Sequence, residues 1–197
     1  MIYVMQGSHS EKYEVIGRET AWEGRYLRCV RLTYKGPAGI QRRWETVERA
    51  NCSGIVVIVP ITDEGEAVLI RQFRPPVNAY VVEFPAGLND RGESIEEAAA
   101  RELLEETGYK AREMLFLTKG PLSSGSSSEV LTAFFARGLN YEGIGQRDET
   151  EDIEVFKVPV DALYDRLALL GDEGNLIDLK IYGLMELARR RASVSPL

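Results

Sequence analysis

The chain has 197 residues, a length that suits one domain, or one domain with a small addition, and its 44% hydrophobic and 28% charged residues are the proportions of an ordinary globular protein. Its formal net charge of −7 argues against nucleic acid or an anionic membrane as the main partner. Two cysteines, Cys29 and Cys52, are too few for a disulfide framework or a zinc site. The first residues lack the basic flank and apolar core of a signal peptide, and no apolar run approaches the ~20 residues of a membrane span, so we expect a cytoplasmic protein.

Residues 1–50 are expected to form an N-terminal β region. Segments 25–35 and 40–49 alternate polar and apolar side chains, which predicts two antiparallel strands joined by a Gly-Pro-Ala-Gly turn. The turn-forming sequence Asn-Cys-Ser-Gly then marks a boundary, and residues 51–197 are expected to form a separate domain of the α/β class.

In this second domain, apolar strand patterns alternate with helical ones. The first two strands are expected to pair as a hairpin around the Asp-Glu-Gly turn at 63–65, and the serine-rich segment 121–129 is expected to be a loop. The expected strands are 55–61, 66–73, 80–86, 114–120, 129–139 and 153–159, and the expected closing helices are 160–170 and roughly 176–192.

The acidic segment that follows the third of these strands carries the strongest helix signals. Ser94 and Glu97 form a capping box, which predicts a helix start near Ile95, and Gly108 supplies a left-handed end. Residues at helical spacing share the face expected to pack on a sheet; they are Ile95, Ala98, Ala99, Glu102, Leu103 and Glu106. Because burying unpaired carboxylates is costly, a divalent cation is the best partner for this face. The alternative is a solvated acidic helix with pairs to Arg101.

The spacing of residues in this segment resembles the Nudix box of the Nudix hydrolases. The matching positions are Gly87, Glu93, Arg101-Glu102-Leu103, Glu105-Glu106 and Gly108, with Tyr109 in place of an aliphatic residue. The resemblance implies a loop–helix–loop that binds Mg²⁺ or Mn²⁺ and hydrolyses a nucleoside diphosphate linked to another group. It also implies the Nudix fold, a mixed-sheet α/β/α sandwich, here with an N-terminal antiparallel β extension.

Segments 42–49, 71–77 and 82–88 together resemble the ADP-ribose pyrophosphatase branch of this family. That likeness implies cleavage of the pyrophosphate bond of ADP-ribose or a related nucleoside diphosphate sugar into a nucleoside monophosphate and a sugar phosphate. One departure is Ser124, which stands where sugar-specific members carry proline. The alternatives are a Nudix hydrolase for GDP-sugars, dinucleoside polyphosphates or oxidised nucleotides, and a nucleotide-sensing domain without activity.

The same resemblance implies substrate contacts outside the helix. Tyr26 and Trp44 occupy the positions of two aromatic rings that sandwich the adenine, and Glu45 and Arg49 also match. The alternative for each ring is packing within the N-terminal sheet. Arg74 lies where a guanidinium holds a phosphate, with Arg71 as a second arginine that is equally well explained as a surface residue.

For catalysis, we hypothesise that carboxylates and one carbonyl hold two or three Mg²⁺ ions; these ligands are Glu102, Glu105, Glu106 and the carbonyl of Ala86. Glu93 is either a lesser ligand or a residue that orients the loop, and Arg101 fixes one of the carboxylates. Glu151, in the acidic segment 147–155, aligns with a glutamate that acts as a base in this branch. Members of the branch are commonly homodimers with exchanged N-terminal strands, so a homodimer is expected here.

Overall fold

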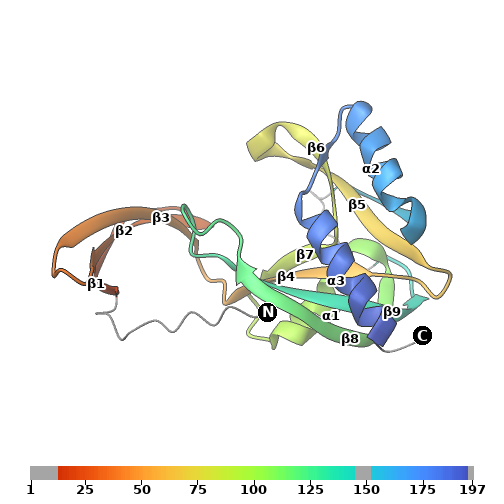
Figure 1. The fold of residues 1–197 in the computed structure, drawn as a ribbon, viewed down its shortest axis with the longest axis horizontal. Coiled ribbons are helices and arrows are strands. Elements are labelled where there is room, and N and C mark those ends of the chain that lie inside the picture. Colours follow the sequence, from red (N-terminus) through yellow and green to blue (C-terminus); the bar gives the residue numbers. More distant parts are fainter. Residues whose placement is uncertain (1–12, 145–151, 195–197) are drawn as a thin grey trace, which may run out of the picture. The chain divides into compact units, whose positions relative to one another are not determined.

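The computed structural model describes residues 13–144 and 152–194, and the chain divides into two compact units. The N-terminal unit contains the described residues up to Asn51 together with Pro121–Glu129. The main unit contains Cys52–Gly120 and the described residues from Val130 onward. Figure 1 traces the elements of both units along the sequence.

The N-terminal unit is a three-stranded antiparallel sheet in the order β1-β2-β3. Its strands are β1 (Glu14–Glu23), β2 (Leu27–Lys35) and β3 (Gln41–Arg49). The strands β2 and β3 confirm the two that the sequence predicts. The strand β1 was not predicted, because register shifts at Val15/Gly17 and at Thr20/Trp22 break the alternation of polar and apolar side chains.

The serine-rich segment 121–129 runs beside β3. Val47 forms a parallel bridge with Ser127, and its backbone N–H donates to the Ser126 carbonyl at 2.9 Å. In return, the backbone N–H of Ser128 donates to the Val47 carbonyl at 3.2 Å. The segment therefore extends the hydrogen-bonded edge of the N-terminal sheet.

The first sheet of the main unit has the order β7-β4-β9-β8. Its strands are β4 (Gly54–Pro60), β7 (Ala86–Asn89), β8 (Tyr109–Pro121) and β9 (Val130–Tyr141). Strand β4 is buried from Ile55 to Pro60 and pairs antiparallel with β7 and parallel with β9. The apolar segment for which a strand was predicted therefore forms a central strand that is buried on both faces.

The second sheet of the main unit has the order β10-β5-β6-β11, with β11 parallel to β6 and the other pairs antiparallel. Its strands are β5 (Glu66–Arg74), β6 (Ala79–Glu83), β10 (Ile153–Pro159) and β11 (Leu176–Ile177). A short 3₁₀ turn, Pro75–Val77, joins β5 to β6.

The expected hairpin between segments 55–61 and 66–73 is reduced to a single antiparallel bridge, between Ile61 and Ala67, because β4 and β5 belong to different sheets. Both edges of β4 are occupied by β7 and β9, so the turn after it carries the chain to the second sheet instead. The expected strand 80–86 is likewise split into the end of β6 and the start of β7. Pro85 separates the two parts, since proline has no N–H to donate to a sheet.

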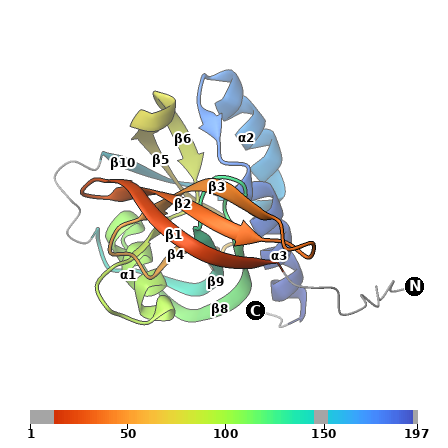
Figure 2. The ribbon, with the colours of Figure 1, turned by 90° about the vertical axis from the view of Figure 1, so that its left-hand side faces the viewer.

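Three helices complete the main unit: α1 (Ile95–Thr107), α2 (Leu163–Asp172) and α3 (Lys180–Val194). Ala99 and Leu103 of α1 share a buried cluster with Ile58 of β4, whereas Met185 of α3 clusters with the alternate residue Val57. Helices α1 and α3 accordingly lie on opposite sides of β4 and β9 (Figure 2). The mixed α/β fold with an N-terminal antiparallel sheet confirms the expected architecture. No helix in the described part of the chain is long and apolar enough to cross a membrane.

Candidate active site

The helix α1 is held at both ends by the caps that the sequence predicts. The Ser94 side chain accepts a hydrogen bond from the Glu97 N–H, and the Glu97 carboxylate accepts one from the Ser94 N–H at 2.8 Å. Gly108 ends the helix with a φ of 77°, in the left-handed region. These caps fix the rotation of the helix, so that Glu102 and Glu106, one turn apart, face the strand β7.

Glu106 is the most deeply buried carboxylate on this helix, with 6% of its surface exposed. Its Oε2 accepts a hydrogen bond from the Ala86 N–H at 2.9 Å. Burial raises the pKa of Glu106 to about 8, and the nearby carboxylates of Glu102 and Glu83 add to this increase. The Ala86 hydrogen bond and the charge of Arg74 oppose the pKa increase without cancelling it. The site therefore holds a carboxyl group whose ionised form lacks sufficient positive charge.

Arg101, in the middle of the same helix, is the centre of an ion network. It donates to Glu93 at 2.6 Å, to Glu102 at 2.8 Å and to Glu105 at 2.9 Å. Its remaining contact, at 2.9 Å, is with the Leu88 carbonyl of β7. One guanidinium thus orients three carboxylates and ties the helix to the preceding strand.

Gly87 of β7 lies directly against the Glu102 carboxylate. A Cβ at this position would lie 1.9 Å from Glu102 Cδ and 2.1 Å from its Oε1. Burial also raises the pKa of Glu102, although Arg101 opposes that increase. The absence of a side chain at Gly87 is therefore what allows Glu102 its observed position.

Arg74 and Glu83 lie on neighbouring strands, and the Arg74 Nε donates to Glu83 Oε1 at 2.8 Å. Glu83 is only 7% exposed and contributes to the raised pKa of Glu106, which brings this pair into the candidate site. Glu83 was not among the predicted site residues. The sequence does contain a signal for it, because a buried carboxylate at the end of the apolar strand β6 requires a compensating partner.

The donor atoms gathered here have the chemistry that a divalent cation needs. Carboxylate and carbonyl oxygens are the preferred ligands of Mg²⁺, and burial raises the pKa values of Glu102 and Glu106, so a bound cation would favour their ionised forms. Within residues 13–144 and 152–194, however, no group of three or more His, Cys, Asp or Glu side chains is arranged to hold a metal ion. Glu102 and Glu105 are bonded to Arg101 instead, and Glu106 to the Ala86 N–H.

The raised pKa of Glu106 predicts that the stability of the metal-free protein falls as the pH rises. The folded state keeps this proton up to about pH 8, whereas the carboxyl of the unfolded chain loses it near its ordinary value of 4.5. Between these values the folded state binds the extra proton, so this group lowers the free energy of unfolding by about 1.4 kcal/mol per pH unit. Thermal unfolding in EDTA from pH 5.5 to pH 8 should therefore show a steeper decline for the wild type than for Glu106→Gln. Parallel pH profiles for the two proteins would contradict this expectation.

Three of the four residues expected to bind the base lie on β3, on different faces of the sheet. Trp44 is 47% exposed, and its Nε1 donates to the Gly125 carbonyl at 3.0 Å. Glu45 follows it and therefore points to the opposite face, where it pairs with Arg31 at 3.6 Å. Arg49 points to the same face as Glu45, and its Nε lies 2.7 Å from the carboxylate of Glu129, the last residue of the serine-rich segment.

Tyr26, the fourth of these residues, lies in the turn between β1 and β2 and is 65% exposed. The next residue, Leu27, pairs with Arg49, whereas Trp44 pairs with Leu32. Tyr26 is therefore six residues along the strand from Leu32, the partner of Trp44, which is about 20 Å. Tyr26 and Trp44 of one chain are therefore too far apart to enclose the same base.

Arg71, in contrast, does not join the site. Arg71 lies on the opposite face of β5 from Arg74, where its guanidinium is 4.2 Å from the Tyr80 ring and its Nε donates to Asn175 Oδ1 at 2.7 Å. Glu151 lies outside the described residues.

Comparison with known proteins agrees with this geometry. A family model described as the NUDIX domain matches residues 53–178. An ADP-sugar pyrophosphatase of Mus musculus is 35% identical to this chain, over 94% of this chain and 91% of its own length. An ADP-ribose pyrophosphatase of Bacillus subtilis is 33% identical, over 75% of this chain and 79% of its own length. A crystal structure of an ADP compounds hydrolase superposes with a TM-score of 0.77 at 26% identity and covers 96% of this chain and 99% of its own.

Proposed function

The chain belongs to the Nudix hydrolase family and is a pyrophosphohydrolase of the ADP-ribose pyrophosphatase type, and from this we propose that it cleaves the pyrophosphate bond of ADP-ribose or a related nucleoside diphosphate sugar. The products are a nucleoside monophosphate and a sugar phosphate. The observation that carries the proposal is the likeness, over nearly the whole chain, to an ADP-sugar pyrophosphatase.

Nudix hydrolases use a divalent metal ion, and we propose Mg²⁺, with Mn²⁺ as a substitute. The proposed ligands are the Ala86 carbonyl and the carboxylates of Glu102 and Glu106, with Glu105 and Glu93 contributing from the Arg101 network. Bound by these residues, Mg²⁺ would neutralise phosphate charge and lower the pKa of the attacking water. The oxygen-only donor set and the deficit of positive charge around Glu106 support this assignment.

The other residues of the site have positioning and proton-transfer roles in this proposal. Arg101 keeps Glu93, Glu102 and Glu105 in place through its three ion pairs. The Arg74 guanidinium binds a phosphate oxygen, with its orientation set by the Glu83 carboxylate. Glu151 is our candidate for the base that takes the proton of the attacking water.

We assign dimerisation and the base pocket to the N-terminal region, residues 1–50. The proposed pocket stacks the adenine between aromatic rings, with Glu45 and Arg49 as further contacts. Because Tyr26 and Trp44 of one chain lie about 20 Å apart along the strands, the two rings would have to come from different subunits. This favours a homodimer with exchanged N-terminal strands. A monomer mass in light scattering at assay concentrations would exclude it.

The serine-rich segment 121–129 is the proposed source of sugar preference. Its Ser124 replaces the proline of the sugar-specific members, and its Ser123 and Ser126 hydroxyls lie 2.7 Å apart on the surface. Because the segment bonds to β3, beside Trp44, a change in the loop would also alter the proposed base pocket.

The proposal is tested by incubating the purified protein and Mg²⁺ with ADP-ribose, ADP-glucose, GDP-mannose and a dinucleoside polyphosphate, and by identifying the products by chromatography. AMP and ribose 5-phosphate from ADP-ribose are the expected products. Cleavage of the dinucleoside polyphosphate alone would overturn the substrate assignment. Nucleotide binding without turnover of any compound would favour a sensor domain.

Replacement of Trp44 is expected to weaken substrate binding more than turnover. Trp44→Ala removes a stacked ring worth about 1–3 kcal/mol per base, so KM for ADP-ribose should rise about tenfold or more while kcat changes little. Trp44→Phe keeps a ring but loses the hydrogen bond to Gly125, and an intermediate KM is expected. Trp22→Ala, at another exposed tryptophan of this sheet, is the control and should leave KM unchanged. Equal KM values for Trp44→Ala and the wild type would remove Trp44 from the base pocket.

A further inference from the structure

Gln72, in the middle of β5, is a buried polar side chain without a hydrogen bond. It is 8% exposed, and its Nε2 has no partner among the described residues. The other side chains with an unpartnered buried atom each make another contact. Asn89 bonds to the Glu93 carbonyl, for example, and Arg189 to the Val160 carbonyl. Buried amides are nearly always hydrogen-bonded, so the unpaired donor of Gln72 requires an explanation.

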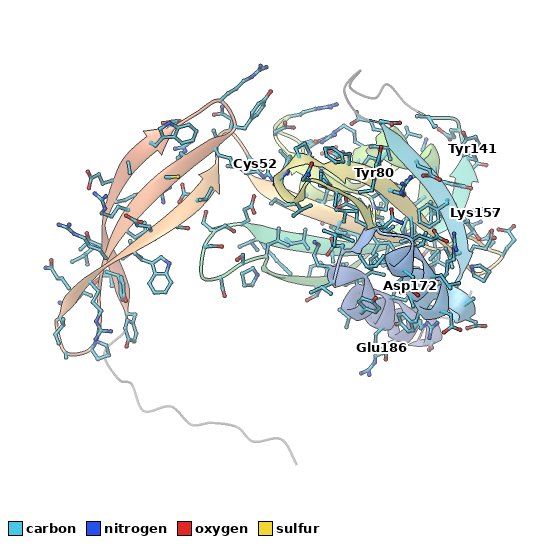
Figure 3. The ribbon with its side chains drawn as sticks, turned by 90° about the horizontal axis from the view of Figure 1, so that it is seen from above. Cys52, Tyr80, Tyr141, Lys157, Asp172 and Glu186 are labelled. Atoms are coloured by element: carbon cyan, nitrogen blue, oxygen red, sulfur yellow. The ribbon has the colours of Figure 1, made fainter. Side chains whose placement is uncertain are left out.

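The position of Gln72 in the sheet places it beside the candidate site. It lies two residues before Arg74, so both side chains project from the same face of β5, with their Cα atoms about 7 Å apart. Arg74 and its partner Glu83 influence the charge of Glu106. Figure 3 labels Tyr80 of β6 and Lys157 of β10, the two strands that flank β5.

The opposite face of β5 offers Gln72 no partner. It carries Arg71 and Phe73, and it packs toward α2 and α3 through residues such as Leu69. On its own face, Gln72 lies between Val81 of β6 and Ile153 of β10, whose side chains contain no hydrogen-bonding atoms. Among the described residues, no side chain supplies a partner for the Gln72 Nε2.

We propose that Gln72 is a substrate-binding residue whose Nε2 donates a hydrogen bond to an oxygen of the nucleoside diphosphate sugar. The inference rests on the proposed function and adds a specificity-determining residue to it. A buried donor left unpaired costs free energy in the empty protein, and a ligand oxygen that accepts its hydrogen bond removes that cost. A site built in this way discriminates strongly against ligands that lack the oxygen.

The acceptor is either a phosphate oxygen, held jointly with Arg74, or a hydroxyl of the terminal sugar. ADP carries both phosphates but no terminal sugar, whereas the α,β-methylene analogue of ADP-ribose carries both and resists hydrolysis. The dissociation constants of these two ligands therefore separate the two acceptors.

The experiment replaces Gln72 by methionine, which has a similar length and no N–H. We expect Gln72→Met to weaken binding of the analogue about 10- to 100-fold, while its Tm equals or exceeds that of the wild type because an unpaired donor has been removed. Gln41→Met, the same change at an exposed position of β3, is the control and should change neither quantity. Weaker binding of ADP by the same factor identifies a phosphate oxygen, and unchanged binding of ADP identifies the sugar. Unchanged affinity for both ligands overturns the proposal.

A second measurement uses the wild-type protein, so it does not depend on whether a variant folds. In ¹H–¹⁵N spectra of the wild-type protein, the side-chain amide signal of Gln72 should shift on saturation with the analogue. An unmoved Gln72 signal, with other signals shifting, would overturn the inference. Hydrolysis of ADP-ribose by the wild type reports separately on the proposed function, so the two failures are distinguishable.

Discussion

Glu106→Gln should lower kcat/KM for the preferred nucleoside diphosphate sugar by on the order of 1000-fold, while the protein remains folded. Glutamine preserves the size of the side chain but removes the charge that we propose binds Mg²⁺. Stability should not suffer, because burial already raises the pKa of this carboxyl to about 8 and a neutral group is favoured there. Initial rates at saturating Mg²⁺, with a thermal unfolding curve for each protein, measure both effects.

The matched control for this variant is Glu96→Gln, the same chemical change in the first turn of the same helix. Glu96 is exposed, so its replacement should leave kcat/KM within a factor of about two of the wild-type value. Near-normal turnover of Glu106→Gln, with the fold intact, would refute the assignment of Glu106 as a metal ligand.

Gly87→Ala is expected to lower kcat/KM about 100-fold, although the substitution adds only one methyl group. The backbone of Gly87 has no positive φ, so β7 itself tolerates alanine. The new Cβ would lie 1.9 Å from Glu102 Cδ, so the carboxylate must move away. A displacement of about 1 Å at a catalytic group can cost about 100-fold in rate. The concentration of Mg²⁺ at half-maximal rate should rise in parallel.

Gly120→Ala provides the control for this substitution, because a Cβ at Gly120 would meet nothing within 4 Å. Its activity and its dependence on Mg²⁺ should match those of the wild type. If Gly87→Ala showed the wild-type dependence on Mg²⁺, Glu102 would not be a ligand whose position depends on Gly87.

The helix α1 could be predicted from sequence in detail because its determinants are local. The capping box of Ser94 and Glu97 and the left-handed Gly108 act within a few residues of the backbone that they fix. The contact between Arg101 and Glu105 is likewise an i,i+4 pair on one helix. These features require no knowledge of the rest of the chain.

Strand pairing could not be predicted in the same way, because it depends on residues that are distant in sequence. The segments that form β4 and β5 both read as apolar strands joined by a short turn, which is also the pattern of a hairpin. The parallel pairing of Val57 with Ala133 instead commits β4 to another sheet. The contact of Val47 with Ser127 likewise joins distant segments.

Two residues of the site were not predicted from the sequence, and the physical reason is the same for both. Glu83 and Gln72 lie in strands that read as apolar, where a single polar side chain does not alter the predicted secondary structure. Their importance becomes visible only through burial and through the partners they have or lack. A polar residue within an apolar strand is thus the signal that could have identified both.

The carboxylates of the candidate site outnumber its arginines, and this has a consequence for the kinetics of encounter. A nucleoside diphosphate approaching the protein meets repulsion from the site and from the net charge of −7. Added salt screens this repulsion within a Debye length of about 10 Å at 0.1 M. In the absence of divalent cations, the association rate constant should therefore increase with ionic strength, opposite to the behaviour of proteins that attract their ligands electrostatically.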